Sequence, residues 1–232
     1  MKGENLILNF SDIYTRGGLT ETLLQRGEKF RLADLSSVPG TSCYLDPLSR
    51  AEILSATAPV SEHFRWIDTG DYHYVSALFS SLCDRPFTLL LFDNHPDDQT
   101  PSFEGVLSCG SWVLEAENNP LCRRIVREGP DGLFDSLNFS PSENVYISID
   151  LDVLSTDCVR TDWSQGKWTL KDLKSALDYV AASGAGILAV DICGGLSESK
   201  GATGESDRIN LACYLELFDY FKHDFKPRYV CC

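Results

Sequence analysis

The chain has 232 residues, of which 43% are hydrophobic and 23% charged, and its formal net charge is −14. This length and composition predict one sizeable hydrophobic core, so we expect a single domain over residues 1–232. The acidic balance argues against a nucleic-acid partner, because binding to a phosphate backbone depends on clustered Lys and Arg.

Short apolar runs predict buried strands at several points along the chain. In chain order they lie at residues 6–10, 64–67, 87–92, 145–149 and 187–192. Two segments, 39–59 and 115–141, show no decisive pattern. The N-terminal apolar stretch is too short for a signal peptide, and no run reaches the length of a membrane span, so we expect a cytoplasmic protein without membrane contact.

Two helices are predicted in the second half of the chain. Residues 170–182 carry an apolar stripe on one helical face, with Thr169 as the N-cap and Asp172 placed for a capping box. Gly184 supplies a stop signal before the next strand. A second helix is expected over much of 209–221. Strands that alternate with helices imply a mainly parallel sheet covered on both faces.

The nine cysteines include no CxxC pair. Their odd number and their spacing favour neither a disulfide framework nor a zinc ribbon, and indicate reduced thiols.

Six potential metal ligands follow three of the apolar runs. They are His73, then Asp93, His95 and Asp97, then Asp150 and Asp152. Side chains at i and i+2 of an extended segment point the same way, so each Asp-x-His or Asp-x-Asp pair can present two ligands on one face. A lone Asp-x-Asp is as often a turn or a helix cap. Three such clusters at strand ends favour a shared site, because α/β folds place active sites there.

Charge indicates what this site would hold. Four carboxylates in one pocket repel each other, and their pKa values rise unless cations neutralise them. A pair of divalent ions would do so, and the clusters therefore predict a two-metal hydrolytic site.

At these residues the sequence resembles the ureohydrolases, the family of arginase, agmatinase and formiminoglutamase. The family's Gly-Gly-Asp-His turn, Asp-x-His-x-Asp cluster and Ser-x-Asp-x-Asp motif correspond here to residues 70–73, 93–97 and 148–152. The likeness extends over roughly residues 65–195. It implies a three-layer α/β/α sandwich with a mainly parallel sheet, of the type that arginases and deacetylases share.

The resemblance also implies two Mn(II) ions bridged by a hydroxide. One ion would be held by His73, Asp93, Asp97 and Asp150, and the other by Asp93, His95, Asp150 and Asp152, with Asp93 and Asp150 bridging. Oxygen-rich ligation with two imidazoles suits Mn(II), although other divalent metals such as Zn(II) are compatible. The hydroxide would attack an amidino or related carbon, and Asp97 would orient it and carry its proton to the leaving amine.

Three positions depart from the family pattern. Tyr72 is inserted before His73, Cys109 stands where arginases have a proton-transferring His, and Gly194 stands where the family has a guanidinium-anchoring Glu. Loss of a buried anion typically weakens binding of a cation by several kcal/mol. The substrate is therefore left unassigned.

Three further residues are candidates for a part in the site. Cys109 is either a small buried residue or a catalytic thiol, and a catalytic thiol needs neighbours that lower its pKa. Asp191, near the end of the strand 187–192, and Glu198, in the following loop, are candidate substrate-binding residues, with Asp191 also a candidate support for the metal ligands.

The leading hypothesis is a binuclear manganese hydrolase of linear C–N bonds other than peptide bonds, acting on a small molecule. One alternative is a single-zinc amide deacetylase, which shares the broad fold and an Asp-x-His ligand pair. Another is a metal-binding protein without catalysis. Ureohydrolases commonly form trimers or hexamers, so a homo-oligomer is a further expectation.

Overall fold

The computed structural model describes residues 5–101, 105–129 and 137–230 of the chain. Its centre is an eight-stranded sheet with the order β2-β1-β4-β9-β8-β5-β7, and β10 pairs with the start of β9. All of these pairings are parallel. The strands are β1 (Asn5–Asn9), β2 (Phe30–Asp34), β4 (Phe64–Ile67), β5 (Phe87–Phe92), β7 (Cys122–Glu128), β8 (Asn144–Asp150), β9 (Gly186–Cys193) and β10 (Arg228–Tyr229).

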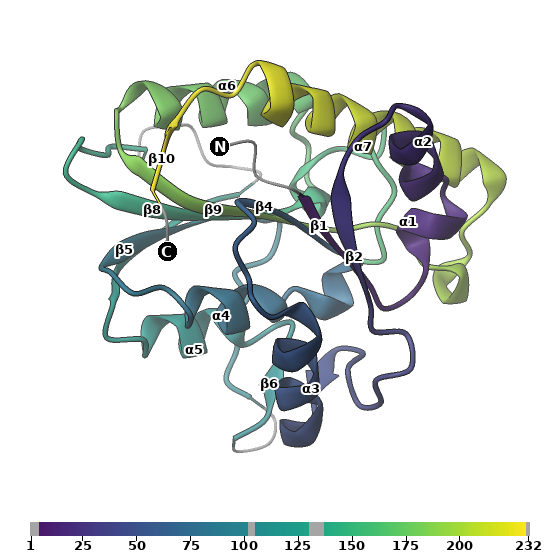
Figure 1. The fold of residues 1–232 in the computed structure, drawn as a ribbon, viewed down its shortest axis with the longest axis horizontal. Helices are drawn as coiled ribbons and strands as arrows, with labels where there is room; N and C mark the ends of the chain where they lie inside the picture. The colour runs from purple at the N-terminus through teal and green to yellow at the C-terminus, as the bar shows by residue number, and fades with distance from the viewer. Residues whose placement is uncertain (1–4, 102–104, 130–136, 231–232) are drawn as a thin grey trace.

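Helices cover both faces of the sheet (Figure 1). One face carries α1 (Ile13–Arg16), α2 (Leu19–Gln25), α6 (Leu170–Ala182) and α7 (Gly204–His223). The other carries α3 (Pro47–Thr57), α4 (Val75–Ser80) and α5 (Trp112–Glu117). Beside α3 lies a small antiparallel ribbon of β3 (Tyr44–Leu45) and β6 (Leu107–Ser108). Short 3-10 turns complete the elements: η1 (Gly70–Tyr72), η3 (Leu151–Val153) and η4 (Glu198–Lys200).

The core lies in two parts, one on each side of the sheet, because successive strand residues face opposite ways. In β1, Ile7 packs into the part beneath α6 and α7, whereas Leu6 and Leu8 pack into the part beneath α3, α4 and α5. The predicted three-layer α/β/α sandwich with a mainly parallel sheet is thus confirmed.

Several predicted boundaries are also confirmed. The strands at 64–67 and 87–92 and the helix at 170–182 have the predicted bounds, and Thr169 and Asp172 form the capping box. The last long helix begins earlier than predicted, at Gly204, because Thr203 caps it through Ser206. The two undecided segments contain α3 and β7, and residues 130–136 lie outside the described part of the chain.

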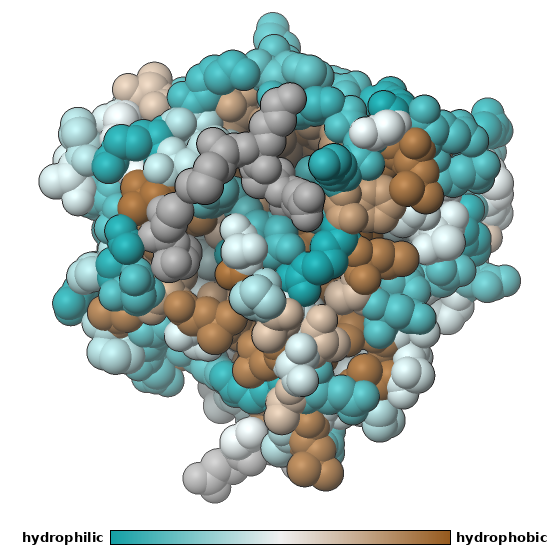
Figure 2. All heavy atoms as spheres, in the orientation of Figure 1, coloured by the Kyte–Doolittle hydropathy of each residue, from teal (hydrophilic) through white to brown (hydrophobic). Residues whose placement is uncertain are grey.

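On the face drawn in Figure 2, hydrophobic side chains are interspersed with hydrophilic ones. Among the described residues, no helix combines the length and the apolar character needed to cross a membrane.

Asp68 joins the ends of β1 and β4. Its side chain is fully buried, and its backbone adopts the left-handed conformation with a φ of 46°. Its carboxylate accepts hydrogen bonds from the backbone N–H groups of Phe10, Ser11 and Thr69 at 2.7, 2.8 and 2.8 Å, and from the Ser11 hydroxyl. These contacts fix the backbone directly before the turn that carries His73.

We predict that Asp68→Ala lowers the free energy of unfolding by about 3 kcal/mol or more, because it leaves three backbone donors without their acceptor. Urea denaturation followed by circular dichroism measures this loss. Asp84→Ala is the control, since Asp84 is exposed and pairs only with the adjacent Arg85 in the ion pairs of the described residues; its midpoint should not change. Equal midpoints for the two variants would contradict the role given to Asp68.

Candidate metal centre

The strand order brings the three predicted clusters to one edge of the sheet. Strands β5 and β8 are parallel neighbours with Phe92 opposite Ile149, so Asp93 and Asp150, one residue further on, come side by side. Asp152 follows in η3. His73 arrives from β4 through the η1 turn, where the inserted Tyr72 stacks on Phe10 with ring centroids 4.2 Å apart. The insertion therefore does not keep His73 from the carboxylates.

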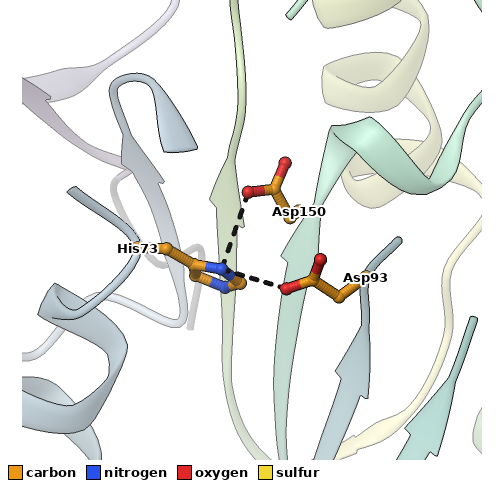
Figure 3. Close-up of side chains that lie close together, drawn as sticks. All are labelled: His73, Asp93 and Asp150. Carbon is orange, nitrogen blue, oxygen red and sulfur yellow. Dashed lines mark ion pairs between the residues drawn. The ribbon is translucent and has the colours of Figure 1, made fainter. Parts of the chain in front are cut away.

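One group of candidate ligands surrounds the imidazole of His73 (Figure 3). Its Nδ1 lies 3.3 Å from Asp93 Oδ2, 3.1 Å from Asp97 Oδ2 and 3.6 Å from Asp150 Oδ2. All four residues are buried. His73 Nδ1 and Asp93 Oδ2 have no hydrogen-bond partner among the described residues, although both atoms are buried. Unsatisfied polar atoms that face one another are expected where a cation would bind.

A second group contains Asp93, His95 and Asp152. His95 Nδ1 lies 2.7 Å from Asp152 Oδ2 and 3.6 Å from Asp93 Oδ1. The His95 side chain is 29% exposed, so this group lies nearer to the solvent than the first. In each of the two groups, His73–Asp93–Asp150 and Asp93–His95–Asp152, the potential ligand atoms lie within 4.8 Å of one another. Asp93 belongs to both groups, as a bridging ligand must, whereas Asp150, the other predicted bridging ligand, belongs only to the first.

Backbone donors hold the carboxylates in place. Asp150 Oδ1 accepts from the Asp152 N–H at 2.9 Å, and Asp93 Oδ1 accepts from the His95 N–H at 2.7 Å. Asp152 Oδ1 accepts from the Asn94 N–H at 3.0 Å. The i and i+2 spacing of the ligands thus also supplies the donors that orient them.

Asp97 is oriented by the indole of Trp112. Trp112 is fully buried, and its Nε1–H donates to Asp97 Oδ2 at 2.7 Å. Asp97 itself has a φ of 48°, in the region that few residues other than Gly adopt. Such strain persists where the surrounding contacts impose it, often at functional sites.

Without bound cations, protons on Asp150 and His95 would balance part of the negative charge of these side chains. Burial, with repulsion from Asp152 and Asp93, raises the pKa of Asp150 well above its ordinary value. Burial also opposes the charge on Asp93, but the neighbouring imidazoles of His73 and His95 outweigh it and lower the pKa of Asp93 to about 2. The hydrogen bond with Asp152, together with the nearby carboxylate of Asp93, raises the pKa of His95 to about 10. The cluster therefore favours the binding of positive charge.

A pocket of about 220 Å³ opens above the candidate ligands. Asp93, His95, Asp97, Asp150 and Asp152 form part of its lining; the other described residues around it are Cys43, Tyr44, Gly70, Gln99, Thr100, Pro101, Ser108, Cys109, Gly110, Ser111 and Trp163. The β3–β6 ribbon and the loop after η3 therefore supply much of the wall.

Trp163 is a pocket residue that sequence analysis did not identify. Its Nε1–H donates to Asp71 Oδ1 at 3.1 Å, and its ring lies 6.0 Å from that of His95. A Cβ at position 70 would lie 2.7 Å from the Trp163 ring and 3.1 Å from Asp150 Oδ2, so the turn requires Gly70. No local pattern marks Trp163, because its contacts come from segments far away in the sequence.

The three further candidates, Cys109, Asp191 and Glu198, differ in their position relative to the pocket. Cys109 lines the pocket, but burial raises the pKa of its thiol, and a reactive thiolate requires the opposite shift. Asp191 is fully buried behind the ligands and is absent from the described pocket lining. Glu198 is exposed on η4, also outside that lining. Neither Asp191 nor Glu198 borders the described pocket, and substrate contact by either residue stays a prediction.

Comparison with known proteins places this geometry in context. A scan against protein-family descriptions finds no match. Over 170 residues the chain is 29% identical to an uncharacterized protein of Thermotoga maritima, and the alignment covers 66% of this chain and 67% of that protein.

Solved structures with the same architecture come from the ureohydrolases. A putative agmatinase from Clostridium difficile has a TM-score of 0.65 at 17% identity, covering 96% of this chain and 98% of the other. A formiminoglutamase variant from Trypanosoma cruzi, solved with Mn²⁺, has a TM-score of 0.64 at 12% identity, covering 97% and 95%. Arginase from Bacillus caldovelox has a TM-score of 0.59 at 14% identity, covering 94% and 98%.

Proposed function

We propose that this chain, which has the arginase-like α/β fold of the ureohydrolases, is a binuclear manganese hydrolase that cleaves a linear C–N bond, other than a peptide bond, in a small molecule. The observation that carries this proposal is the position of Asp93 in both ligand groups, at the base of an open pocket.

The donor set fits two divalent ions. His73, Asp93 and Asp150, with Asp97 beside them, would hold the inner ion, and Asp93, His95 and Asp152 the outer one. Oxygen donors with one imidazole for each ion suit Mn(II), the metal present in the formiminoglutamase neighbour. A single-zinc deacetylase site would not use the second group, which is why we favour the two-metal reading.

Bound divalent ions supply a nucleophile at neutral pH by lowering the pKa of water, and they polarise the group under attack. The protein would supply the proton acceptor. Burial, and then repulsion from Asp93, raises the pKa of Asp97, so this carboxyl can accept a proton and release it again. The Trp112 indole occupies Asp97 Oδ2, which leaves Oδ1 as the acceptor.

The substrate belongs to the amidino or ureido compounds in this proposal, and its identity is open. Gln99, Ser108 and Ser111 offer neutral hydrogen-bonding groups around the pocket, and Trp163 offers an aromatic surface. Neutral donors and acceptors of this kind can orient a planar C–N group without forming an ion pair.

The proposal is tested by turnover of the manganese-loaded chain on a panel of guanidino, formimidoyl and ureido compounds, followed by release of ammonia and urea. Asp97→Asn should lose turnover while it keeps its manganese, because the amide still offers an oxygen to the inner ion but cannot accept the proton. A fully loaded protein that turns over none of these compounds would instead indicate metal binding without catalysis. Tightly held zinc with activity on acylated amines would favour the deacetylase alternative.

Metal stoichiometry provides a separate prediction. Asp93→Ala should lose both ions because Asp93 belongs to both groups, whereas Asp152→Ala should mainly weaken the outer ion. Elemental analysis after reconstitution with Mn(II) and dialysis measures both, with exposed Asp84→Ala as the control. Retention of both ions by Asp93→Ala would refute the shared ligand.

Manganese binding should release protons. The pKa of His95 is raised to about 10, so its imidazole is protonated at neutral pH and must lose that proton to become a ligand. Affinity should therefore rise as the pH rises from about 7 towards 10. Titration calorimetry in buffers of different ionisation enthalpy measures the released protons, and a heat that does not depend on the buffer would contradict the prediction.

A further inference from the structure

A chain of buried hydrogen bonds leads away from His73 on the side opposite to the carboxylates. His73 Nε2 lies 2.9 Å from Ser148 Oγ, and Ser148 Oγ lies 3.0 Å from Ser76 Oγ. The Ser76 hydroxyl in turn lies near the carboxylate of Asp191 and favours its charged form. All four side chains are at most 1% exposed.

Asp191 is surrounded by donors. Tyr146 Oη donates to its Oδ2 at 2.5 Å, and Arg65 Nη1 lies 3.4 Å from its Oδ1. Arg65 is opposite Asp191 in the β4–β9 pairing, and Ser148 is opposite Asp191 in the β8–β9 pairing. The register of three adjacent strands therefore places a carboxylate, its cation and the first hydroxyl of the chain side by side.

The contact between the two serines sets the direction of these hydrogen bonds. The Ser148 hydroxyl donates to the Ser76 oxygen, and a hydroxyl has only one proton to donate. The oxygen of Ser148 is therefore free to accept only from a protonated His73 Nε2.

We propose that Ser148 and Ser76 are positioning residues that keep a proton on His73 Nε2 and so direct the Nδ1 lone pair at Asp93, Asp97 and Asp150. The inference rests on the proposed function, since it assigns Nδ1 as the atom that binds the inner ion. Supporting contacts of this kind typically change metal affinity about 10- to 100-fold.

The test combines nuclear magnetic resonance with metal titration on the full chain. The chain contains only four histidines, so ¹⁵N-histidine labelling can resolve the Nε2–H of His73. In the metal-free wild type this proton should be protected from exchange, and Ser148→Ala should remove the protection. Ser148→Ala and Ser76→Ala should each weaken inner-site Mn(II) binding by about 10- to 100-fold by calorimetry.

Ser80→Ala is the matched control. Ser80 is also fully buried on α4, but its hydroxyl donates to the Ala77 carbonyl at 3.2 Å. It should therefore leave both the exchange protection and the affinity unchanged.

The outcomes separate this inference from the proposed function. Protection lost in Ser148→Ala, in a chain that binds no manganese, supports the hydrogen-bond chain and refutes the metal centre. Tight manganese binding that is the same in wild type, Ser148→Ala and Ser76→Ala overturns the inference and leaves the metal centre standing. An Nε2–H that exchanges freely in the wild type also overturns it.

Discussion

The accumulation of buried negative charge at one edge of the sheet is the constraint on which the rest of this structure depends. Asp93 and Asp150 come together because β5 and β8 are parallel neighbours in register, and burial alone would disfavour their charged forms. Like charges in a poorly solvated site are costly unless cations compensate them. Two imidazoles supply part of that compensation, and bound divalent ions would supply the remainder.

The surrounding residues hold the cluster from several distant segments. Asn94 links it to the loop after η3, since its side chain donates to the Ser164 carbonyl at 2.8 Å while its N–H donates to Asp152. Gly166 N–H reaches the Asp152 carbonyl at 2.7 Å. Trp112 orients Asp97 from the opposite side of the pocket. A site that must keep repelling groups within a few ångströms needs such supports on every side, because each group would otherwise rotate away.

Sequence patterns predicted the parts of this structure that are local or strongly apolar. Strand β5 is buried at every position, so its apolar run alone defined it, and α6 combines an apolar stripe with a capping box. Strands β2 and β7 were not predicted, because they lie at the edges of the sheet and carry charged residues at exposed positions, such as Arg123 and Arg124 in β7. Edge strands commonly carry charge because it discourages pairing with other chains. An apolar run is therefore a poor criterion at an edge.

The residues of the candidate site also divide into those that local sequence patterns predicted and those that they did not. The six candidate ligands could be identified from the sequence, because five of them lie at or just after the ends of β5 and β8 at spacings of two, and His73 follows β4 after one short turn. Trp163, the indole bond of Trp112 and the inward orientation of Asp191 were not, because each depends on which strands become neighbours. The pairing of Cys43 with Cys109 across the β3–β6 ribbon is another such contact: the Cys109 N–H donates to the Cys43 carbonyl at 2.9 Å, and both side chains line the pocket.

Backbone geometry disfavours an anchor for a guanidinium group at the position where the ureohydrolases that the sequence resembles have one. The sequence resemblance matches the anchoring Glu of that family to Gly194, which has a φ of 109°. A Cβ there would lie 2.8 Å from Asp150 Oδ1 and 2.9 Å from the Leu151 nitrogen, so no side chain fits without moving a candidate metal ligand. The backbone conformation at position 194, and not only the identity of the residue, therefore disfavours an anchoring side chain there. Selectivity must then come from the pocket wall, from the β3–β6 ribbon and from Trp163, where the chain has neutral groups in reach of the candidate ions.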